Sequence, residues 1–247
     1  MAEERVAAGA GAAGAAEAVR LVVCDLDGTL VDRADGPAPG AAEALHELQA
    51  AGVLLMICTG RRPAVAAPVI DRLRLHPDIL GSFHGGVIHD LRGDVPLRHL
   101  HIPEDPAAAV QWALRQRGLD VSTYREGERR LVTRIVATGG IQAVAGAREV
   151  IDRLGLRGVR LDLAGGGWLD FRHPLAVKEQ AVAFIARRLE IPLERVAAAG
   201  DDPSDAGMLR IVGRPIAVGD EAGPLRGLPA TFVSPAGLAA CLRALLD

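Results

Sequence analysis

Short uninterrupted runs of apolar residues alternate along the chain with segments in which apolar residues recur at helical spacing. Residues 40–51 form one such segment, with Gly52 positioned to end a helix, and residues 177–185 form another. Strands without polar alternation, separated by helices, are typical of a parallel sheet covered on both faces. The pattern therefore predicts an α/β fold with a Rossmann-like, doubly wound parallel sheet, whose strands include 21–24, 53–58, 195–200 and 215–219.

The middle of the chain has a different pattern. Strand-like segments flank turns at residues 92–93 and 126–127, and a further hairpin is expected over 159–172. Asp105, which precedes a proline, is a candidate N-cap for one helix, and a second helix is expected near 141–154. These antiparallel pieces with two helices indicate an α+β domain inserted into the α/β domain.

Three parts of the chain follow from these patterns. Residues 19–83 and 174–247 are expected to form the core domain, and residues 84–173 the inserted domain. Residues 1–18 are low in complexity and carry acids where a signal peptide needs bases, so we interpret them as a disordered leader without function.

Net charge and cysteine content limit the kinds of molecule that the protein is expected to bind and the compartment in which it is expected to lie. A net charge of −3 argues against a nucleic-acid groove built on bulk electrostatics. No apolar run approaches the length of a membrane span. The three cysteines lack CxxC spacing, so we interpret them as small buried hydrophobes in a protein of the reducing cytoplasm. A small molecule is the expected partner, and the oligomeric state is left open.

Polar residues gather where the predicted strands end. Asp25 and Asp27 follow the first strand, residues 59–61 follow the second, and Asp201 opens an acidic cluster after the third. Lys178 lies at the start of a predicted helix. In open α/β sheets the binding crevice lies beyond the carboxyl ends of the strands, so these segments are expected to converge.

Such a convergence has a definite chemistry. Asp25, Asp27 and Asp201 would repel one another unless a cation lay between them, and clustered carboxylates suit Mg²⁺. Thr59 and Lys178 would donate hydrogen bonds to a tetrahedral oxyanion. Each segment alone is explained as well by an ordinary turn, helix cap or solvated lysine. Together they predict phosphoryl transfer, with one carboxylate as nucleophile and another as acid and base.

The four segments, in order, resemble the motifs of the haloacid dehalogenase (HAD) phosphatase superfamily. The matching stretches are "DLDGT", "CTGR", the lysine of "PLAVKEQAV" and "GDDPSDAGML". The insertion, between the second and third motifs, resembles the type II (C2) cap. That subgroup includes Cof-type sugar phosphatases, sucrose- and trehalose-phosphate phosphatases and phosphomannomutases.

The resemblance implies a role for each matched residue in the phosphoryl step. Asp25 would be the nucleophile that becomes phosphorylated, and Asp27 the general acid and later the base. Thr59 and Lys178 would hold the transferring phosphoryl group. Gly60 would let the backbone come close enough to donate an N–H to the same group.

The resemblance also implies a metal site. The Asp25 carboxylate, the Asp27 backbone carbonyl and Asp201 would bind Mg²⁺. Asp205 would steady the metal-bound waters or Lys178, and Asp202 would be a helper.

The sequence indicates less clearly which residues recognise the leaving group. Arg125 and Arg172 of the insertion are candidates, although a solvated hairpin position explains a single cap residue equally simply. Arg61 is expected near the phosphate or in a surface salt bridge. His84 and His173 flank the insertion, and packing at the hinges accounts for both.

We therefore expect a Mg²⁺-dependent phosphomonoester hydrolase acting on a small phosphorylated metabolite, such as a sugar or polyol phosphate. A phosphosugar mutase or phosphotransferase is the alternative within the same chemistry. A catalytically silent binding protein on this scaffold is a third, but it would be expected to have lost an acid or the lysine. Cof-type members usually carry NG at the position of His84-Gly85 and ND at that of Ser204-Asp205, so the substrate stays open.

Overall fold

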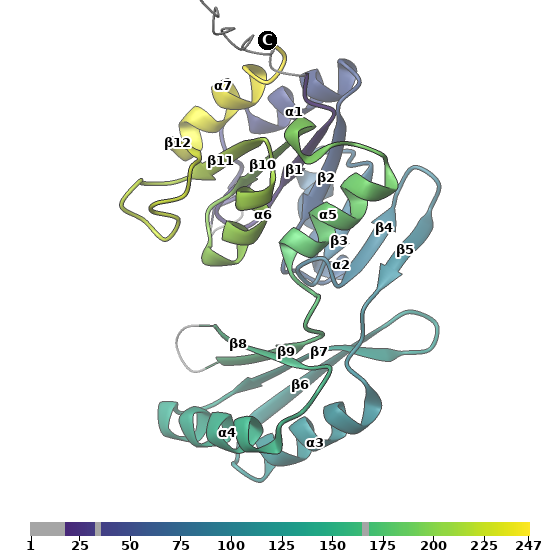
Figure 1. The fold of residues 1–247 in the computed structure, drawn as a ribbon, viewed down its shortest axis with the longest axis vertical. Coiled ribbons are helices and arrows are strands. Elements are labelled where there is room, and N and C mark those ends of the chain that lie inside the picture. The colour runs from purple at the N-terminus through teal and green to yellow at the C-terminus, as the bar shows by residue number, and fades with distance from the viewer. Residues whose placement is uncertain (1–17, 33–35, 165–167) are drawn as a thin grey trace, which may run out of the picture.

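The fold consists of two sheets with their own helices, connected by two short linkers (Figure 1). The computed structural model describes residues 18–32, 36–164 and 168–247. The predicted leader, 1–18, lies outside the described residues except for Ala18. The larger sheet has eight strands in the order β12-β11-β10-β1-β2-β3-β4-β5, and the smaller has four in the order β6-β7-β9-β8.

Six neighbouring strands of the larger sheet run parallel, as the apolar runs predict. β1 is buried at every position because the two faces of the sheet are both covered. Val22 and Cys24 pack into one apolar cluster, whereas Leu21 and Val23 pack into the other. The parallel strands are β1 (Leu21–Cys24), β2 (Leu54–Cys58), β3 (Ile79–Ser82), β10 (Val196–Gly200), β11 (Arg214–Val218) and β12 (Thr231–Val233).

Helices cover both faces of this sheet, which confirms the doubly wound α/β class. One face packs against α1 (Ala41–Ala50), α2 (Pro63–Arg72) and α7 (Leu238–Arg243). The other packs against α5 (Lys178–Arg188) and α6 (Ala206–Ile211). Among the helices of the described residues, none has the length and apolar character needed to cross a bilayer. Short 3₁₀ helices are η1 (Leu193–Arg195), η2 (Pro203–Asp205) and η3 (Pro235–Gly237).

In the described part of the chain, the smaller sheet has helices on one face. Its apolar face packs against α3 (Glu104–Arg115) and α4 (Ile141–Leu154), which lie on the side away from the larger sheet (Figure 1). The opposite face is therefore turned toward the larger domain. The strands are β6 (Asp120–Glu126), β7 (Leu131–Thr138), β8 (Arg160–Ala164) and β9 (Trp168–Arg172).

Two expectations about the inserted segment need correction. The hairpin of β4 (Val87–Asp90) and β5 (Val95–His99) pairs antiparallel with β3, so it extends the larger sheet although residues 84–173 were all assigned to the insertion. A hairpin pattern does not reveal which sheet edge it joins. Asp105 lies inside the first turn of α3 rather than at its N-cap, which is Pro103. An acid in the first turn still favours the helix through its dipole.

Burial should make two of the three thiols unreactive. Cys24 and Cys58 have no exposed surface, and burial raises the pKa of each to about 12. We expect iodoacetamide at pH 8 to leave both unmodified in the native protein, because it reacts with the thiolate. Peptide mapping by mass spectrometry checks this, with the urea-unfolded chain as the control in which all three thiols react. Native labelling of Cys24 or Cys58 at the unfolded rate would contradict the packing described here.

Candidate active site

The loop after β1 brings two carboxylates to the carboxyl edge of the sheet. The backbone N–H of Asp25 donates to the carbonyl of Ala199 over 3.0 Å, so strand pairing with β10 continues up to this residue. Gly28 then turns the chain with a φ of 84°, and a Cβ there would overlap the carboxylate of Asp201. Glycine is therefore required for the loop to lie against Asp201.

Three carboxylates meet at this point. Asp25, Asp201 and Asp205 each have an oxygen within 4.8 Å of the others, and Asp25 and Asp205 are buried. Lys178, at the first position of α5, reaches into the same cluster. Its Nζ lies 2.8 Å from Asp25 Oδ1 and 2.5 Å from Asp205 Oδ1, and the residue is 2% exposed.

Burial is the largest influence on the pKa values of Asp25 and Asp201. It raises the pKa of Asp25 to about 7, although Lys178 acts in the opposite direction. Burial likewise raises the pKa of Asp201 to about 6, while a hydrogen bond from the Thr29 hydroxyl lowers it. Burial alone would lower the pKa of Lys178, but the Asp25 and Asp205 carboxylates raise it above its ordinary value.

The donor set fits Mg²⁺. Three close carboxylates face a single ammonium group, so the cluster carries an excess of negative charge that a hard divalent cation would offset. All the oxygens come from carboxylates, the ligand type that Mg²⁺ prefers. Asp25 and Asp201 are the residues of this set that the sequence predicted as metal ligands.

The three acids of the segment "GDDPSD" make different contacts. Asp205 Oδ2 accepts hydrogen bonds from the backbone N–H groups of Asp201 (3.1 Å) and Asp202 (3.0 Å). Asp202 caps η2 by accepting from the Ser204 N–H over 2.9 Å. Asp205 thus fixes both the loop and Lys178, and leaves the Asp201 carboxylate to face Asp25.

Arg61 binds the second carboxylate of the β1 loop. Its Nε lies 3.0 Å from both Asp27 oxygens, and its Nη2 lies 2.5 Å from Asp27 Oδ1. The Asp27 side chain is 51% exposed, so it lies at the open edge of the carboxylate cluster. Of the two expectations for Arg61, the structure supports a salt bridge, but one made at the site itself.

Residues after β2 contribute unequally. Thr59 is fully buried, its hydroxyl accepts from the Arg61 N–H over 3.1 Å, and it is not among the described residues that line a cavity here. Gly60 does line the cavity, and a Cβ on it would approach His84 Nε2 to 2.7 Å. The expected contact of Thr59 with a phosphoryl group therefore stays a prediction.

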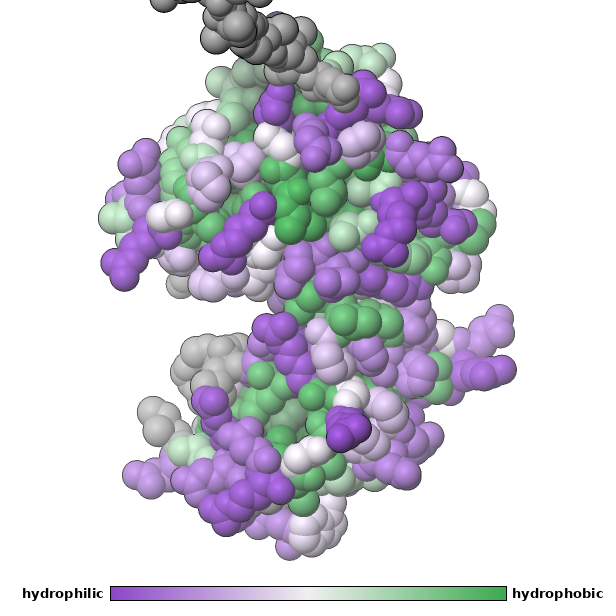
Figure 2. Space-filling model, viewed as in Figure 1, coloured by the Kyte–Doolittle hydropathy of each residue, from purple (hydrophilic) through white to green (hydrophobic). Residues whose placement is uncertain are grey.

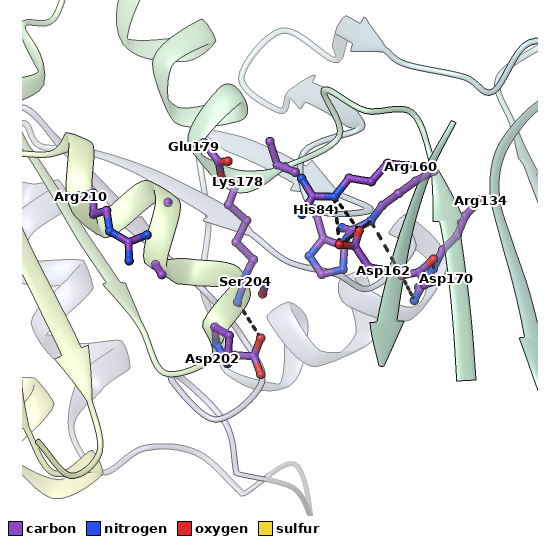
Figure 3. Close-up of a pocket in the computed structure, with 15 residues that line it drawn as sticks. His84, Arg134, Arg160, Asp162, Asp170, Lys178, Glu179, Asp202, Ser204 and Arg210 are labelled. Carbon is purple, nitrogen blue, oxygen red and sulfur yellow. Dashed lines mark hydrogen bonds and ion pairs between the residues drawn. The ribbon is translucent and has the colours of Figure 1, made fainter. Parts of the chain in front are cut away.

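Two connected cavities lie between the domains. The smaller, about 430 Å³, lies at the carboxylate cluster, and the larger, about 680 Å³, extends to the four-stranded sheet (Figure 3). They share His84, Lys178, Asp202 and Ser204. A molecule can thus place one end among the carboxylates and the other against the domain built on the smaller sheet, which is called the cap below. The smaller cavity is also lined by Asp25, Asp27, Gly28, Gly60 and Asp201.

His84 lies at the junction of the two cavities rather than serving only hinge packing, as the sequence analysis assigned it. Figure 3 shows its ring between Lys178 and the charged residues of the cap. Burial, with the nearby positive charges of Arg172 and Lys178, holds the pKa of His84 well below its usual range. Its Nδ1 is shielded from solvent and lacks a hydrogen-bond partner among the described residues. A neutral imidazole with an unmet hydrogen bond thus faces the site.

The two cap arginines predicted from the sequence have different positions. Arg172 lines the larger cavity. Arg125 does not; its Nη1 donates to the Arg130 carbonyl within its own hairpin. The sequence analysis missed three other charged cap residues of the cavity, Arg134, Arg160 and Asp162, whose signal was their alternation along β-strands. Asp170, two residues before Arg172 on the same strand, also lines the cavity.

The cap is held to the core beside this cavity. The ring of Tyr124 lies 6.3 Å from that of Phe83 and 5.8 Å from the guanidinium of Arg62. The Nη1 of Arg134 donates to the carbonyl of Gly60 over 3.3 Å. These contacts join the two domains beside the cavity.

Comparison with known proteins agrees with this arrangement. The sequence matches the haloacid dehalogenase-like hydrolase family over residues 22–135 and 153–227, well over half of the chain. The chain belongs to this family. The HAD-like assignment made from the four motifs, and the fold class, are thereby confirmed.

Individual relatives are distant in sequence and close in fold. Phosphatase YwpJ of Bacillus subtilis is 23% identical over 258 residues, covering 82% of this chain and 90% of that protein. A HAD-like hydrolase from Bacteroides thetaiotaomicron superposes with a TM-score of 0.80 at 19% identity, over 92% of this chain and 99% of its own. The HAD subclass IIB sugar phosphatase BT4131 has a TM-score of 0.72 at 17% identity, over 92% and 98%.

Loss of the buried lysine should destabilise the protein. Lys178→Met leaves the Asp25 and Asp205 charges buried without their partner, so we expect the free energy of unfolding to fall by about 3–5 kcal/mol. Urea denaturation followed by circular dichroism measures this. Adding Asp205→Asn should recover part of the loss, and Arg187→Met, at an exposed site on the same helix, is the matched control. An unchanged midpoint for Lys178→Met would contradict the ion pairs described.

Proposed function

We propose that this hydrolase is a Mg²⁺-dependent phosphomonoesterase that acts on a small phosphorylated metabolite through an aspartyl phosphate on Asp25. One observation carries the proposal. Asp25 lies buried at the end of β1, paired with Lys178, in a carboxylate cluster that opens into a cavity.

Asp25 is the nucleophile of the first step. An oxygen of its carboxylate attacks phosphorus, and the bond from phosphorus to the leaving-group oxygen breaks. Asp27 gives that oxygen its proton, and the alcohol departs. In the second step water attacks the acyl phosphate while Asp27 takes its proton, which releases inorganic phosphate and restores Asp25.

The other residues of the site hold charge in place. Lys178 and the backbone N–H of Gly60 would bind the phosphoryl oxygens, and Arg61 orients Asp27 at the edge of the cavity. Mg²⁺, held by Asp25 and Asp201, would neutralise the phosphoryl group and its attacking carboxylate. Asp205 fixes the positions of the Lys178 ammonium group and of the loop that carries Asp201.

The shape and lining of the larger cavity support a polar leaving group. Its volume of about 680 Å³ is large enough for a monosaccharide or similar polyol, and most of the residues that line it are charged. BT4131, which shares the fold, is named a sugar phosphatase. A sugar or polyol phosphate, of Cof type or trehalose-phosphate type, is therefore the proposed substrate class. The free cysteines suit a reducing compartment, and we include a cytoplasmic location in the proposal.

A phosphosugar mutase or phosphotransferase would use the same first step. It differs only in keeping water from the aspartyl phosphate. Comparison of free phosphate with isomerised or transferred phosphate from one sugar phosphate separates these activities. A catalytically silent scaffold is disfavoured because the acids and the lysine are retained and lie in contact.

Removal of the nucleophile is the direct test of the mechanism. Asp25→Asn should lower phosphate release from p-nitrophenyl phosphate at least about a thousandfold, because an amide does not attack phosphorus. Asp71→Asn, at an exposed position of α2, is the control and should keep the wild-type rate. Wild-type turnover by Asp25→Asn would exclude an aspartyl phosphate at this residue.

Metal dependence is tested separately. EDTA-treated, dialysed protein should lose phosphatase activity and regain it on addition of Mg²⁺, because the clustered carboxylates need a cation. Isothermal titration of Mg²⁺ into the metal-free protein gives an independent readout, and Asp201→Asn should weaken that binding. Full activity in the metal-free protein would rule out the proposed cofactor.

A further inference from the structure

Three arginines lie side by side on the face of the smaller sheet that is turned toward the core. Arg172 of β9 is the register partner of both Arg134 on β7 and Arg160 on β8. All three line the larger cavity. Like charges directly opposite on neighbouring strands are destabilising, so a row of three needs compensation.

The sheet itself supplies only part of that compensation. The next row holds two carboxylates, Asp162 and Asp170, which are also register partners. Arg134 binds Asp170 through two nitrogens at 2.8 and 2.9 Å. Arg160 and Arg172 share Asp162, with Arg172 Nη2 at 2.7 Å and Arg160 Nε at 2.9 Å from its oxygens. Three guanidinium groups therefore face two carboxylates.

The uncompensated charge is concentrated at Arg172. This residue is 5% exposed, and its Nη1 has no hydrogen-bond partner among the described residues. Its nearest second carboxylate, Asp170, lies at 3.9 Å and is already bound by Arg134. A buried guanidinium with an unmet donor carries a free-energy cost that an anion in the cavity would remove.

Among the described residues, no carboxylate on the core side of the cavity forms an ion pair with the arginine row. The charged residues there are Lys178, which is bound by Asp25 and Asp205, and Asp202, which caps η2. Glu179 and Arg210 are the remaining charged lining residues and have opposite signs. The positive excess therefore belongs to the cap row.

We propose that the leaving group of the substrate carries a second anion, a carboxylate or a phosphate, which binds at Arg172 and Arg160. The inference rests on the proposed function, which puts the transferred phosphoryl group at Asp25 and Lys178. The cap row then faces the other end of the substrate across His84, whose Nδ1 also lacks a partner in the described part of the chain.

The competing interpretation is a neutral polyol, whose hydroxyl groups would hydrogen-bond to the paired arginines and aspartates. Matched ligands separate the two. 3-Phosphoglycerate and glycerol 3-phosphate differ only by a carboxylate in place of a hydroxymethyl group. Fructose 1,6-bisphosphate and fructose 6-phosphate differ only by the second phosphate. The first pair tests a carboxylate and the second pair tests a phosphate.

Binding to the Asp25→Asn protein in Mg²⁺, measured by isothermal titration, needs no turnover. We expect the member that carries the second anionic group, in at least one pair, to bind about tenfold or more tightly than the member without it. Arg160→Gln, at a position whose side chain is 45% exposed, should reduce that preference about tenfold without unfolding the cap. Arg172→Gln should also reduce the preference about tenfold, and circular dichroism checks that this variant is folded. Arg153→Gln, on the exposed face of α4, is the control and should leave the preference unchanged.

Equal binding within both pairs, or tighter binding of the members without the second anionic group, would overturn the inference. So would an Arg160→Gln effect of the same size on both members of a pair, which would indicate a general packing role. The proposed function fails on a different result, namely the absence of phosphate release by wild-type protein from p-nitrophenyl phosphate and all four ligands. The two failures are therefore distinguishable.

Discussion

The ion pairs of Lys178 with Asp25 and Asp205 are the interaction on which the rest of the site depends. They join the end of β1, the start of α5 and the loop after β10 at one buried point. A buried ammonium group is tolerated only when carboxylates surround it, and buried carboxylates need it in turn. Lys178 pairs with Asp25 and Asp205, and Asp201 lies within the same carboxylate cluster, so the cluster has more acids than its one lysine can balance.

The strand order explains why distant segments meet. β1 lies between β10 and β2, so the loops that follow these three strands open at the same edge of the sheet. Gly28 lets the loop after β1 lie against Asp201. Asp205 holds the loop after β10, because its carboxylate accepts the backbone N–H groups of Asp201 and Asp202. Parallel topology thus converts separate stretches of sequence into one site, and the covered faces of the sheet exclude water from below it.

Sequence reasoning succeeded where function depends on strand ends and failed where it depends on register. The convergence of Asp25, Lys178 and Asp201 followed from buried strands of known direction, because such ends share an edge. The pairing of the β4–β5 hairpin with β3 could not be inferred, since an alternating pattern does not specify its neighbour. For the same reason the arginine row of the cap was invisible, because Arg134 and Arg160 become neighbours of Arg172 only through the order β7-β9-β8.

Clustered carboxylates lie on the core side of the space between the domains and a row of arginines lies on the cap side, and Arg134 of that row contacts the core. Arg134 binds Asp170 in the cap and also donates to the carbonyl of Gly60, a residue that lines the cavity at Asp25. Arg134 therefore joins the arginine row of the cap to the loop after β2, which lines the cavity at Asp25. Under the proposed function, an anion bound at the arginine row and a phosphoryl group bound near Gly60 would each act on residues joined by this hydrogen bond. A substrate that contacts both ends of the cavity would then stabilise the contact between cap and core more than one that contacts a single end.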